Sequence, residues 1–188
     1  MDFEEEFRDS LQEVPESFFD RERFVPGVGD LDADVVLVGE APGESEVEEG
    51  EPFVGRAGEL LDEILEEIGV ERSELYITNL VKVRPPDNRD PREEEIEAWK
   101  PVLEAEIRRV DPETVVTLGN FASRELVGTD KGVSRIHGNR YTRGGREILP
   151  AYHPAAPLYD PDKRQVLKED LLKAFGRTLQ GQSTLEDH

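Results

Sequence analysis

The sequence predicts an α/β fold organised around a four-stranded parallel sheet. Four short segments with strand character alternate with segments of helical periodicity, an order typical of parallel strands joined by right-handed helical crossovers. The first strand segment, residues 34–39, is a continuous apolar run of the kind that is buried on both faces of a sheet. The length of 188 residues suits a single domain spanning 1–188, and no repeat or linker divides the chain.

The first half of the chain predicts one strand between two helices. Phe3, Phe7 and Leu11 recur at helical spacing, which predicts a short helix before a loop rich in Pro and Gly that reaches residue 33. The strand at 34–39 ends in a turn with glycine and proline, and an acidic loop follows. An amphipathic helix is predicted from about Ala57, with Gly69 as its C-terminal stop.

The second half alternates strands with helices. Asp90 and Pro91 are typical of an N-cap and a first helical turn, so they predict the start of a helix after the second strand. Residues 135–147 predict a basic loop or hairpin, and residues 177–188 a frayed end. The remaining predictions are strands at 75–81, 114–118 and 148–152, a short helix ending near Val127, and a final helix at 166–175.

The composition is strongly acidic and lacks cysteine. The chain carries 44 acidic residues against 23 basic ones, for a net charge of −21. We interpret this excess, combined with few lysines, as the solvated surface of a halophilic protein, since concentrated salt screens self-repulsion. The absence of cysteine excludes disulfides and thiolate metal sites, and the three histidines do not form a zinc pattern.

The sequence gives no sign of a membrane protein. No apolar run approaches the length of a membrane span, and the acidic N-terminus does not resemble a signal peptide. We therefore expect a cytoplasmic protein without membrane association, and we expect it to be a monomer.

Four chemically distinct side chains follow the predicted strand ends or lie in adjoining loops. Glu40 ends the first strand, Phe53 lies in the loop after it, Asn79 is near the end of the second, and His153 follows the fourth. Each of the last three has a structural alternative, as a core ring, a turn residue and a satisfied loop histidine, respectively. Parallel strands would bring all four side chains to one edge of the sheet, where such folds bind ligands.

Five motifs together resemble one known family. The segments GEAPGESE, PFVGRAGELLD, ITNLVKVRPPDNR, VVTLGNFA and HPA match, in order and spacing, the family 4 uracil-DNA glycosylases over roughly residues 24–175. The resemblance implies a three-layer fold with a four-stranded parallel sheet between helices, preceded here by an acidic segment at 1–23. It also implies hydrolysis of the bond between uracil and deoxyribose in DNA, the first step of base excision repair.

The resemblance assigns roles in this reaction to individual residues. Phe53 would stack on a flipped-out uracil, and Asn79 would accept from its N3–H and donate to its O4, a pattern that cytosine reverses. His153 would donate a hydrogen bond to uracil O2 as negative charge develops, and Glu40 would position water or stabilise the cationic sugar. The backbone of two further residues would line the pocket, Gly39 and Ala41.

DNA binding requires local positive charge, because the chain as a whole repels phosphates. Residues 131–168 carry eight basic residues against three acidic ones and flank His153. Leu158 would be either a wedge that fills the place of the flipped base or a core leucine. The predicted DNA contacts are Arg84, Arg89, Arg135, His137, Arg140, Leu158, Lys163 and Arg164.

His137 lies in an Arg-Ile-His segment that also resembles a different branch of the superfamily. In that branch, such a segment follows the second strand, and its histidine traps the abasic sugar covalently. Here the segment lies between the third and fourth predicted strands, so we expect His137 to contact phosphate or simply to be exposed.

The sequence departs from the family at its iron–sulfur cluster. Family 4 enzymes hold this cluster on four cysteines, whereas Val83 and Trp99 stand at two of the expected positions and Phe18 and Phe19 near the other two. Because cluster binding needs thiolates, we predict a protein without a metal or cofactor, in which apolar packing replaces the cluster.

The preferred interpretation is an enzyme that acts on uracil-containing DNA. Two alternatives stay open: a non-catalytic DNA-binding or interaction module of the same fold, and a glycosylase whose base preference has shifted to hypoxanthine or mismatches. The retained set of Glu40, Phe53, Asn79 and His153 favours the uracil-excising enzyme.

Overall fold

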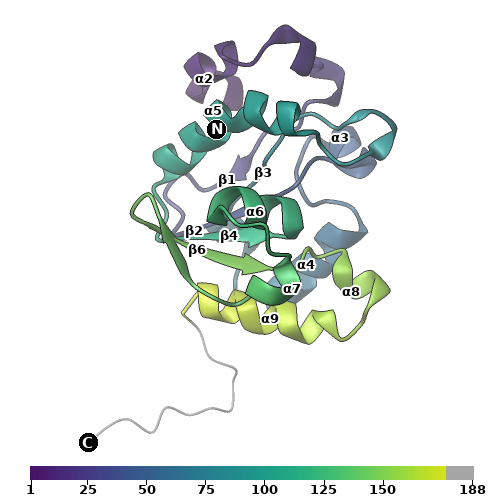
Figure 1. The fold of residues 1–188 in the computed structure, drawn as a ribbon, viewed down its shortest axis with the longest axis vertical. Coiled ribbons are helices and arrows are strands. Elements are labelled where there is room, and N and C mark those ends of the chain that lie inside the picture. The colour runs from purple at the N-terminus through teal and green to yellow at the C-terminus, as the bar shows by residue number, and fades with distance from the viewer. Residues whose placement is uncertain (177–188) are drawn as a thin grey trace, which may run out of the picture.

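The computed structural model describes residues 1–176, and within them one six-stranded sheet lies between helices (Figure 1). The strands are β1 (Val28–Gly29), β2 (Val35–Gly39), β3 (Tyr76–Asn79), β4 (Thr114–Leu118), β5 (Tyr141–Arg143) and β6 (Arg146–Ala151), in the order β1-β3-β2-β4-β6-β5. The four middle strands run parallel, which confirms the predicted α/β class and its parallel core. The predicted frayed end at 177–188 lies outside the described residues.

Two short edge strands make the sheet mixed. β5 belongs to the hairpin that was one of the two alternatives predicted for residues 135–147, whereas β1 was not predicted. β1 pairs antiparallel with β3, and β5 forms an antiparallel hairpin with β6. The hairpin turns at Gly144 and Gly145, whose φ angles of 57° and 79° suit a turn that follows the twist of the two strands. A strand of two residues is too short to carry a periodic apolar signal, so β1 could not be predicted.

Helices cover both faces of the sheet, as Figure 1 shows. The described helices are α1 (Phe3–Glu6), α2 (Arg8–Gln12), α3 (Glu44–Glu49), α4 (Arg56–Glu67), α5 (Glu93–Val110), α6 (Asn120–Val127), α7 (Val133–Ile136), α8 (Ala156–Tyr159) and α9 (Lys163–Ala174). Single 3₁₀ turns lie at Glu16–Phe18, Arg21–Arg23, Arg72–Glu74 and Pro86–Asn88. None of the helices within residues 1–176 is both long and apolar enough to cross a membrane.

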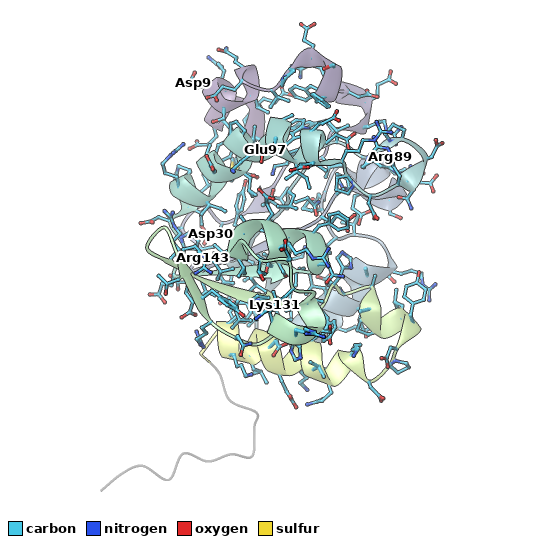
Figure 2. All side chains as sticks on the ribbon, in the orientation of Figure 1. Asp9, Asp30, Arg89, Glu97, Lys131 and Arg143 are labelled. Carbon is cyan, nitrogen blue, oxygen red and sulfur yellow. The ribbon has the colours of Figure 1, made fainter. Side chains whose placement is uncertain are left out.

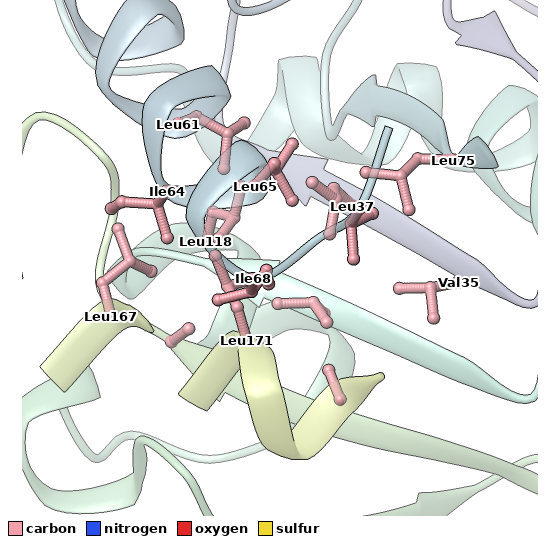
Figure 3. Close-up of a cluster of buried hydrophobic side chains, with 14 of the residues drawn as sticks. Val35, Leu37, Leu61, Ile64, Leu65, Ile68, Leu75, Leu118, Leu167 and Leu171 are labelled. Carbon is pink, nitrogen blue, oxygen red and sulfur yellow. The ribbon is translucent and has the colours of Figure 1, made fainter. Parts of the chain in front are cut away.

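Side chains that alternate between the two faces of the sheet form two separate hydrophobic cores. Leu37 of β2 faces α4 and α9, where it joins Leu61 and Leu171 in one apolar cluster (Figure 3). Its neighbour Val36 faces α5 and α6 and joins a second cluster with Leu103. Because successive side chains of a strand point to opposite faces, one continuous apolar run serves both cores.

The helices that follow β2 and β3 differ from the sequence predictions. The segment after β2, predicted as an acidic loop, contains α3, which ends at Gly50 with a φ of 75°. Its acidic first turn suits the helix dipole, but no apolar periodicity marks it in the sequence. The predicted N-cap at Asp90 is wrong: α5 begins at Glu93, because the carboxylate of Glu95 accepts the backbone N–H of Arg92 at 2.8 Å and closes the first turn there.

Candidate active site

The residues that follow the parallel strands meet at one edge of the sheet. Gly39 at the end of β2 is in register with Asn79 at the end of β3. On the other side, the N–H of Gly119 after β4 donates to the carbonyl of Ala151 at the end of β6 at 2.9 Å. His153 follows Ala151 by two residues, and Figure 1 shows β6 pointing toward the side of the molecule where α8 lies. The predicted edge therefore exists as a structural unit.

Gly39 is the point at which the ring of Phe53 and the amide of Asn79 converge. A Cβ atom at Gly39 would lie 2.5 Å from Cζ of Phe53, and it would also collide with Oδ1 of Asn79. Both side chains are buried, with exposed fractions of 4% and 3%. The missing side chain at Gly39 thus lets an aromatic ring and a carboxamide from separate elements share one space.

Phe53 has a backbone conformation that non-glycine residues rarely adopt. Its φ angle is +53°. Arg72 stabilises this conformation by donating to the carbonyl of Phe53 at 3.0 Å and also to the carbonyl of Pro52. Gly58 of α4 has no side chain to collide with the Phe53 carbonyl. Strained residues of this kind persist where their surroundings hold them, often at functional sites.

His153 is held as a neutral imidazole with a defined tautomer. Its ring centroid lies 5.5 Å from that of Phe53, with an angle of 34° between the ring planes. Nδ1 accepts the backbone N–H of Ala155 at 3.0 Å, so the proton of the neutral ring is on Nε2. Burial lowers the pKa of His153 to about 4, so the ring is neutral at neutral pH and Nε2–H is its hydrogen-bond donor.

Glu40 lies beside a second carboxyl group. Burial is the main cause that raises the pKa of Glu40 to about 7, followed by a hydrogen bond with Asp90 and by the charge of Asp90. The backbone carbonyl of Glu40 accepts the N–H of Val81 at 3.2 Å, which attaches this residue to the segment after β3. Glu40 therefore changes its charge near neutral pH.

Two of the predicted DNA contacts gather around Tyr152, the residue before His153. The ring of His137 lies 5.0 Å from the ring of Tyr152, and Nδ1 of His137 lies 2.8 Å from Oδ2 of the buried Asp170. Nζ of Lys163 lies 4.7 Å from the Tyr152 ring centroid. His137 and Lys163 thus share one aromatic support next to the candidate site.

Leu158 and Arg135 are exposed. Leu158 on α8 has an exposed fraction of 39%, which excludes the core alternative, and its neighbour Tyr159 has 89%. Arg135 on α7 is exposed and forms no side-chain ion pair within residues 1–176. These side chains are available to a macromolecular partner, and Tyr159 was not identified from the sequence.

Two of the remaining predicted arginines are paired with carboxylates of the protein, and the third is partly buried. Arg89 donates to both carboxylate oxygens of Glu95, at 2.7 and 2.9 Å, and Figure 2 shows Arg89 on the same side of the molecule as α3 and α8. Arg164 forms two hydrogen bonds with Glu67 of α4, and they lower the pKa of that carboxyl to about 2. Arg84 is partly buried, and its Nε has no hydrogen-bond partner within the described residues.

Arg140 does not fit the predicted DNA-binding surface. Its guanidinium pairs with Glu147 and also donates to the carbonyl of Lys173 at 2.7 Å. Glu147 is in register with Thr114 at the amino ends of β6 and β4. Arg140 therefore lies at the edge of the sheet opposite His153, because the hairpin carries the basic segment back to the start of β6.

The iron–sulfur cluster that the family resemblance implies does not fit the residues at its expected place. Val83 and Phe18 pack against an apolar cluster that contains Trp99. Nε1 of Trp99 donates to the carbonyl of Phe18 at 3.2 Å, and the rings of Phe19 and Trp99 meet edge-on at 5.1 Å. The chain has no cysteine, and no group of three or more His, Asp or Glu within residues 1–176 is placed to hold a metal ion. The methyl group of Ala41 packs against the same cluster, so only its backbone is left to line the candidate site.

Sequence reasoning missed several residues that shape this edge. Asp90 was interpreted as a helix cap, and Lys82 was not considered, although it is completely buried and bonded to the carbonyl of Asn79. The lone lysine in the otherwise apolar run after the second strand is the one signal that could have drawn attention to it. Arg72 leaves no such signal, because its partners lie in a loop 19 and 20 residues earlier.

The sequence is also similar to a family of known proteins. A model of the Uracil DNA glycosylase superfamily matches residues 26–178. A type-4 uracil-DNA glycosylase of Sulfurisphaera tokodaii is 41% identical, over 88% of this chain and 83% of its own. The corresponding protein of Saccharolobus solfataricus is 44% identical over 81% and 75% of the two chains, and that of Archaeoglobus fulgidus 42% identical over 88% and 87%. The chain therefore belongs to the uracil-DNA glycosylase superfamily, within its type-4 family.

Proposed function

We propose that the protein is a uracil-DNA glycosylase, which hydrolyses the N-glycosidic bond of deoxyuridine in DNA and releases free uracil. The observation that carries this proposal is the convergence of Phe53 and Asn79 at the side-chain-free backbone of Gly39, with the ring of His153 5.5 Å from that of Phe53. Relatives of the same type-4 family, at 41% to 44% identity, bear the name of this activity. The proposal assigns the chain to the start of base excision repair.

Recognition of uracil follows from the ring and the amide. A base extruded from the helix can stack on Phe53 while its pairing edge faces Asn79. The carboxamide can accept from N3–H and donate to O4, whereas cytosine presents an acceptor and a donor in those places. A buried amide discriminates strongly, because the wrong base leaves polar groups unpaired.

His153 stabilises the departing base. Cleavage of the C–N bond leaves negative charge on uracil, and part of this charge develops on O2. The Nε2–H of a neutral imidazole donates to that oxygen without first attracting an anion in the ground state, so the interaction strengthens as charge develops. Because Nδ1 accepts the hydrogen bond from the N–H of Ala155, the ring proton stays on Nε2.

Glu40 acts on the sugar side of the same bond. As a carboxylate, it stabilises the positive charge that develops on deoxyribose and orients the attacking water. Its pKa of about 7 means that the carboxylate fraction grows as the pH rises through neutrality. The reaction is therefore expected to accelerate over that interval.

The DNA itself is held by a small exposed surface beside the site. His137 and Lys163 are placed to contact phosphates, Arg135 extends this charge, and Leu158 and Tyr159 project from α8 toward the duplex. Since much of the basic charge in the predicted segment is paired with carboxylates, we propose that apolar contacts contribute a large share of DNA affinity.

Further features of the proposal concern the state of the protein. We propose that it works without an iron–sulfur cluster, with the apolar cluster around Trp99 providing the structural support instead. We also propose that its acidic surface adapts it to concentrated salt and that it acts as a monomer on DNA in the cytoplasm.

The decisive test is excision from labelled oligonucleotides that contain one uracil. Single strands and duplexes with uracil opposite guanine or adenine are incubated across a wide range of salt, and free uracil and abasic sites are both quantified. Matched oligonucleotides with cytosine, thymine or hypoxanthine measure the base range. We expect uracil release and little reaction with cytosine; no base release from any oligonucleotide at any salt concentration would overturn the proposal in favour of a non-catalytic module.

A further inference from the structure

A fully buried ion pair lies behind the base-reading amide. Nζ of Lys82 is 2.6 Å from Oε2 of Glu106, and neither side chain is exposed to any extent. Burial lowers the pKa of Lys82 and raises that of Glu106, while the mutual attraction of the pair opposes both shifts. Because desolvation offsets much of the attraction in such a pair, stability alone is a weak reason for its presence.

The lysine is bonded directly to the residue that reads the base. Its Nζ donates to the main-chain carbonyl of Asn79 at 2.6 Å. The N–H of Leu80 donates to the carbonyl of Gly39 in β2. The backbone N–H and C=O of Asn79, the preceding residue, therefore point away from β2, toward the edge of β3 where β1 lies. There β1 pairs with β3 only as far as Ile77, and Lys82 satisfies the carbonyl that no strand reaches.

The glutamate fixes the same strand from α5. Oε1 of Glu106 accepts the hydroxyl groups of Tyr76 at 2.9 Å and of Thr78 at 2.8 Å. Gly27 leaves room for this network, since a Cβ atom there would lie 2.6 Å from the Tyr76 hydroxyl oxygen. One carboxylate and one ammonium group therefore hold three of the four residues of β3.

The hydrogen-bond network of Glu106 with Tyr76 and Thr78 lies on one face of the sheet, and the candidate site lies on the other face. Tyr76 and Thr78 point toward α5, so Asn79 points toward α4, where its Oδ1 lies beside Gly39. With its main-chain position held from behind, the side chain of Asn79 has only two torsions left to order. A site that discriminates bases by two hydrogen bonds needs this degree of placement.

We propose that Lys82 and Glu106 are positioning residues, which hold the end of β3 so that the amide of Asn79 faces the base. This inference rests on the proposed function, because it gives the network a purpose in reading uracil. It extends that function from the side chains that touch the base to a buried support that does not.

The test combines the change Lys82→Met/Glu106→Gln with Asn79→Ala. The double change removes both charges together, leaves no unpaired buried ion, and retains an amide oxygen for the hydroxyl groups of Tyr76 and Thr78. Single-turnover uracil excision and affinity for DNA with an abasic-site analogue are measured in both backgrounds.

We expect the double change to slow excision by about 10- to 100-fold when Asn79 is present. In the Asn79→Ala background it should slow the remaining activity by about twofold or less, because the residue through which it acts is gone. Affinity for the abasic analogue should stay unchanged in both. An equal loss of rate in the two backgrounds would overturn the inference and indicate a general structural role.

Ser123→Ala provides the matched control. It removes a buried hydrogen bond of 2.9 Å to Thr117 of β4 on the same face of the sheet, and it should leave the excision rate unchanged. If the double variant fails to fold, Thr78→Val replaces it: this change removes one bond to Glu106 and keeps the ion pair. A smaller loss that again depends on Asn79 is expected.

A measurement without catalysis separates this inference from the proposed function. The side-chain amide resonances of Asn79, assigned by their absence in Asn79→Ala, report the order of the amide in the DNA-free protein. We expect them to broaden or shift in the Lys82→Met/Glu106→Gln variant and to stay unchanged in Ser123→Ala. Unaltered Asn79 resonances in the double variant would overturn the positioning role, even if the wild-type protein excises uracil. Altered Asn79 resonances would support the positioning role, even if the wild-type protein does not excise uracil.

Discussion

Replacing Asp90 by asparagine is expected to make uracil excision faster at acidic pH. The pKa of Glu40 is raised from 4.5 to about 7, by burial first and then by a hydrogen bond with Asp90 and by its charge. Asp90→Asn keeps the shape of that neighbour and removes its charge. The pKa of Glu40 should therefore fall below 7 but stay above 4.5, because burial, the largest cause, remains.

The size of the effect follows from the fraction of Glu40 that is ionised. If the carboxylate form drives cleavage, the wild-type rate falls by about tenfold for each pH unit below the pKa. At one unit below about 7, the variant with its lower pKa should therefore be faster by up to about tenfold. Well above neutrality, Glu40 is ionised in both proteins and their rates should be equal. His153 does not contribute to this interval, since its pKa is lowered to about 4.

The assay is single-turnover excision from a single-stranded uracil oligonucleotide, measured across the acidic and neutral range. Asp87→Asn serves as the control, because it removes a negative charge from the same loop and Asp87 is not among the causes of the Glu40 shift. Asp87→Asn should leave the fall of the excision rate at acidic pH where it is in the wild-type protein. The reasoning is refuted if Asp90→Asn does not change the pH at which the excision rate falls. It is also refuted if Glu40→Gln keeps both the wild-type rate and the wild-type dependence of that rate on pH.

Four further changes test the other parts of the site. Asn79→Asp should weaken discrimination against cytosine, since a carboxylate cannot donate to uracil O4; an unchanged ratio of uracil to cytosine excision rates would remove Asn79 from base reading. His153→Ala should slow the single-turnover step by about 10²- to 10³-fold with little change in affinity; a large loss of affinity at an unaltered rate would contradict this. Leu158→Ala should reduce excision from duplexes more than from single strands, as a wedge requires, and equal losses on both substrates would argue against that role. Trp99→Ala should lower the free energy of unfolding by about 3–5 kcal/mol in denaturant titration, and iron chelation should leave wild-type excision unchanged, whereas stoichiometric iron in the purified protein would disprove the cluster-free state.

The main strands and helices could be predicted because burial imposes a pattern on each segment separately. A strand covered on both faces needs a continuous apolar run, as in β2, and a helix on a sheet needs the periodicity that Leu61 and Leu65 show in α4. α3 and β1 have no such pattern. The first is set by its acidic first turn and by Gly50, and the second by its neighbour β3, so neither could be predicted from periodicity.

In the candidate site, too, some residues could be placed from the sequence and others could not. Glu40, Asn79 and His153 could be placed at one edge, because strand direction follows from the alternation of strands with helices. The sequence could not decide whether Phe53 is a core ring or a site ring. In the structure it packs in the apolar cluster with Leu61 and also lies beside Gly39, in a backbone conformation that Arg72 maintains from another loop.

What the sequence alone determined is the set of residues that follows the parallel strands, and with it the chemistry available at the edge: a carboxylate, a ring, an amide and an imidazole. Local patterns of burial carry that information. Only the tertiary structure decided that Asp90 stands beside Glu40, that Lys82 supports Asn79 from behind, and that Arg140 lies at the opposite edge. These relations join loops and side chains with no periodic pattern between them, and packing rather than local preference sets their distances.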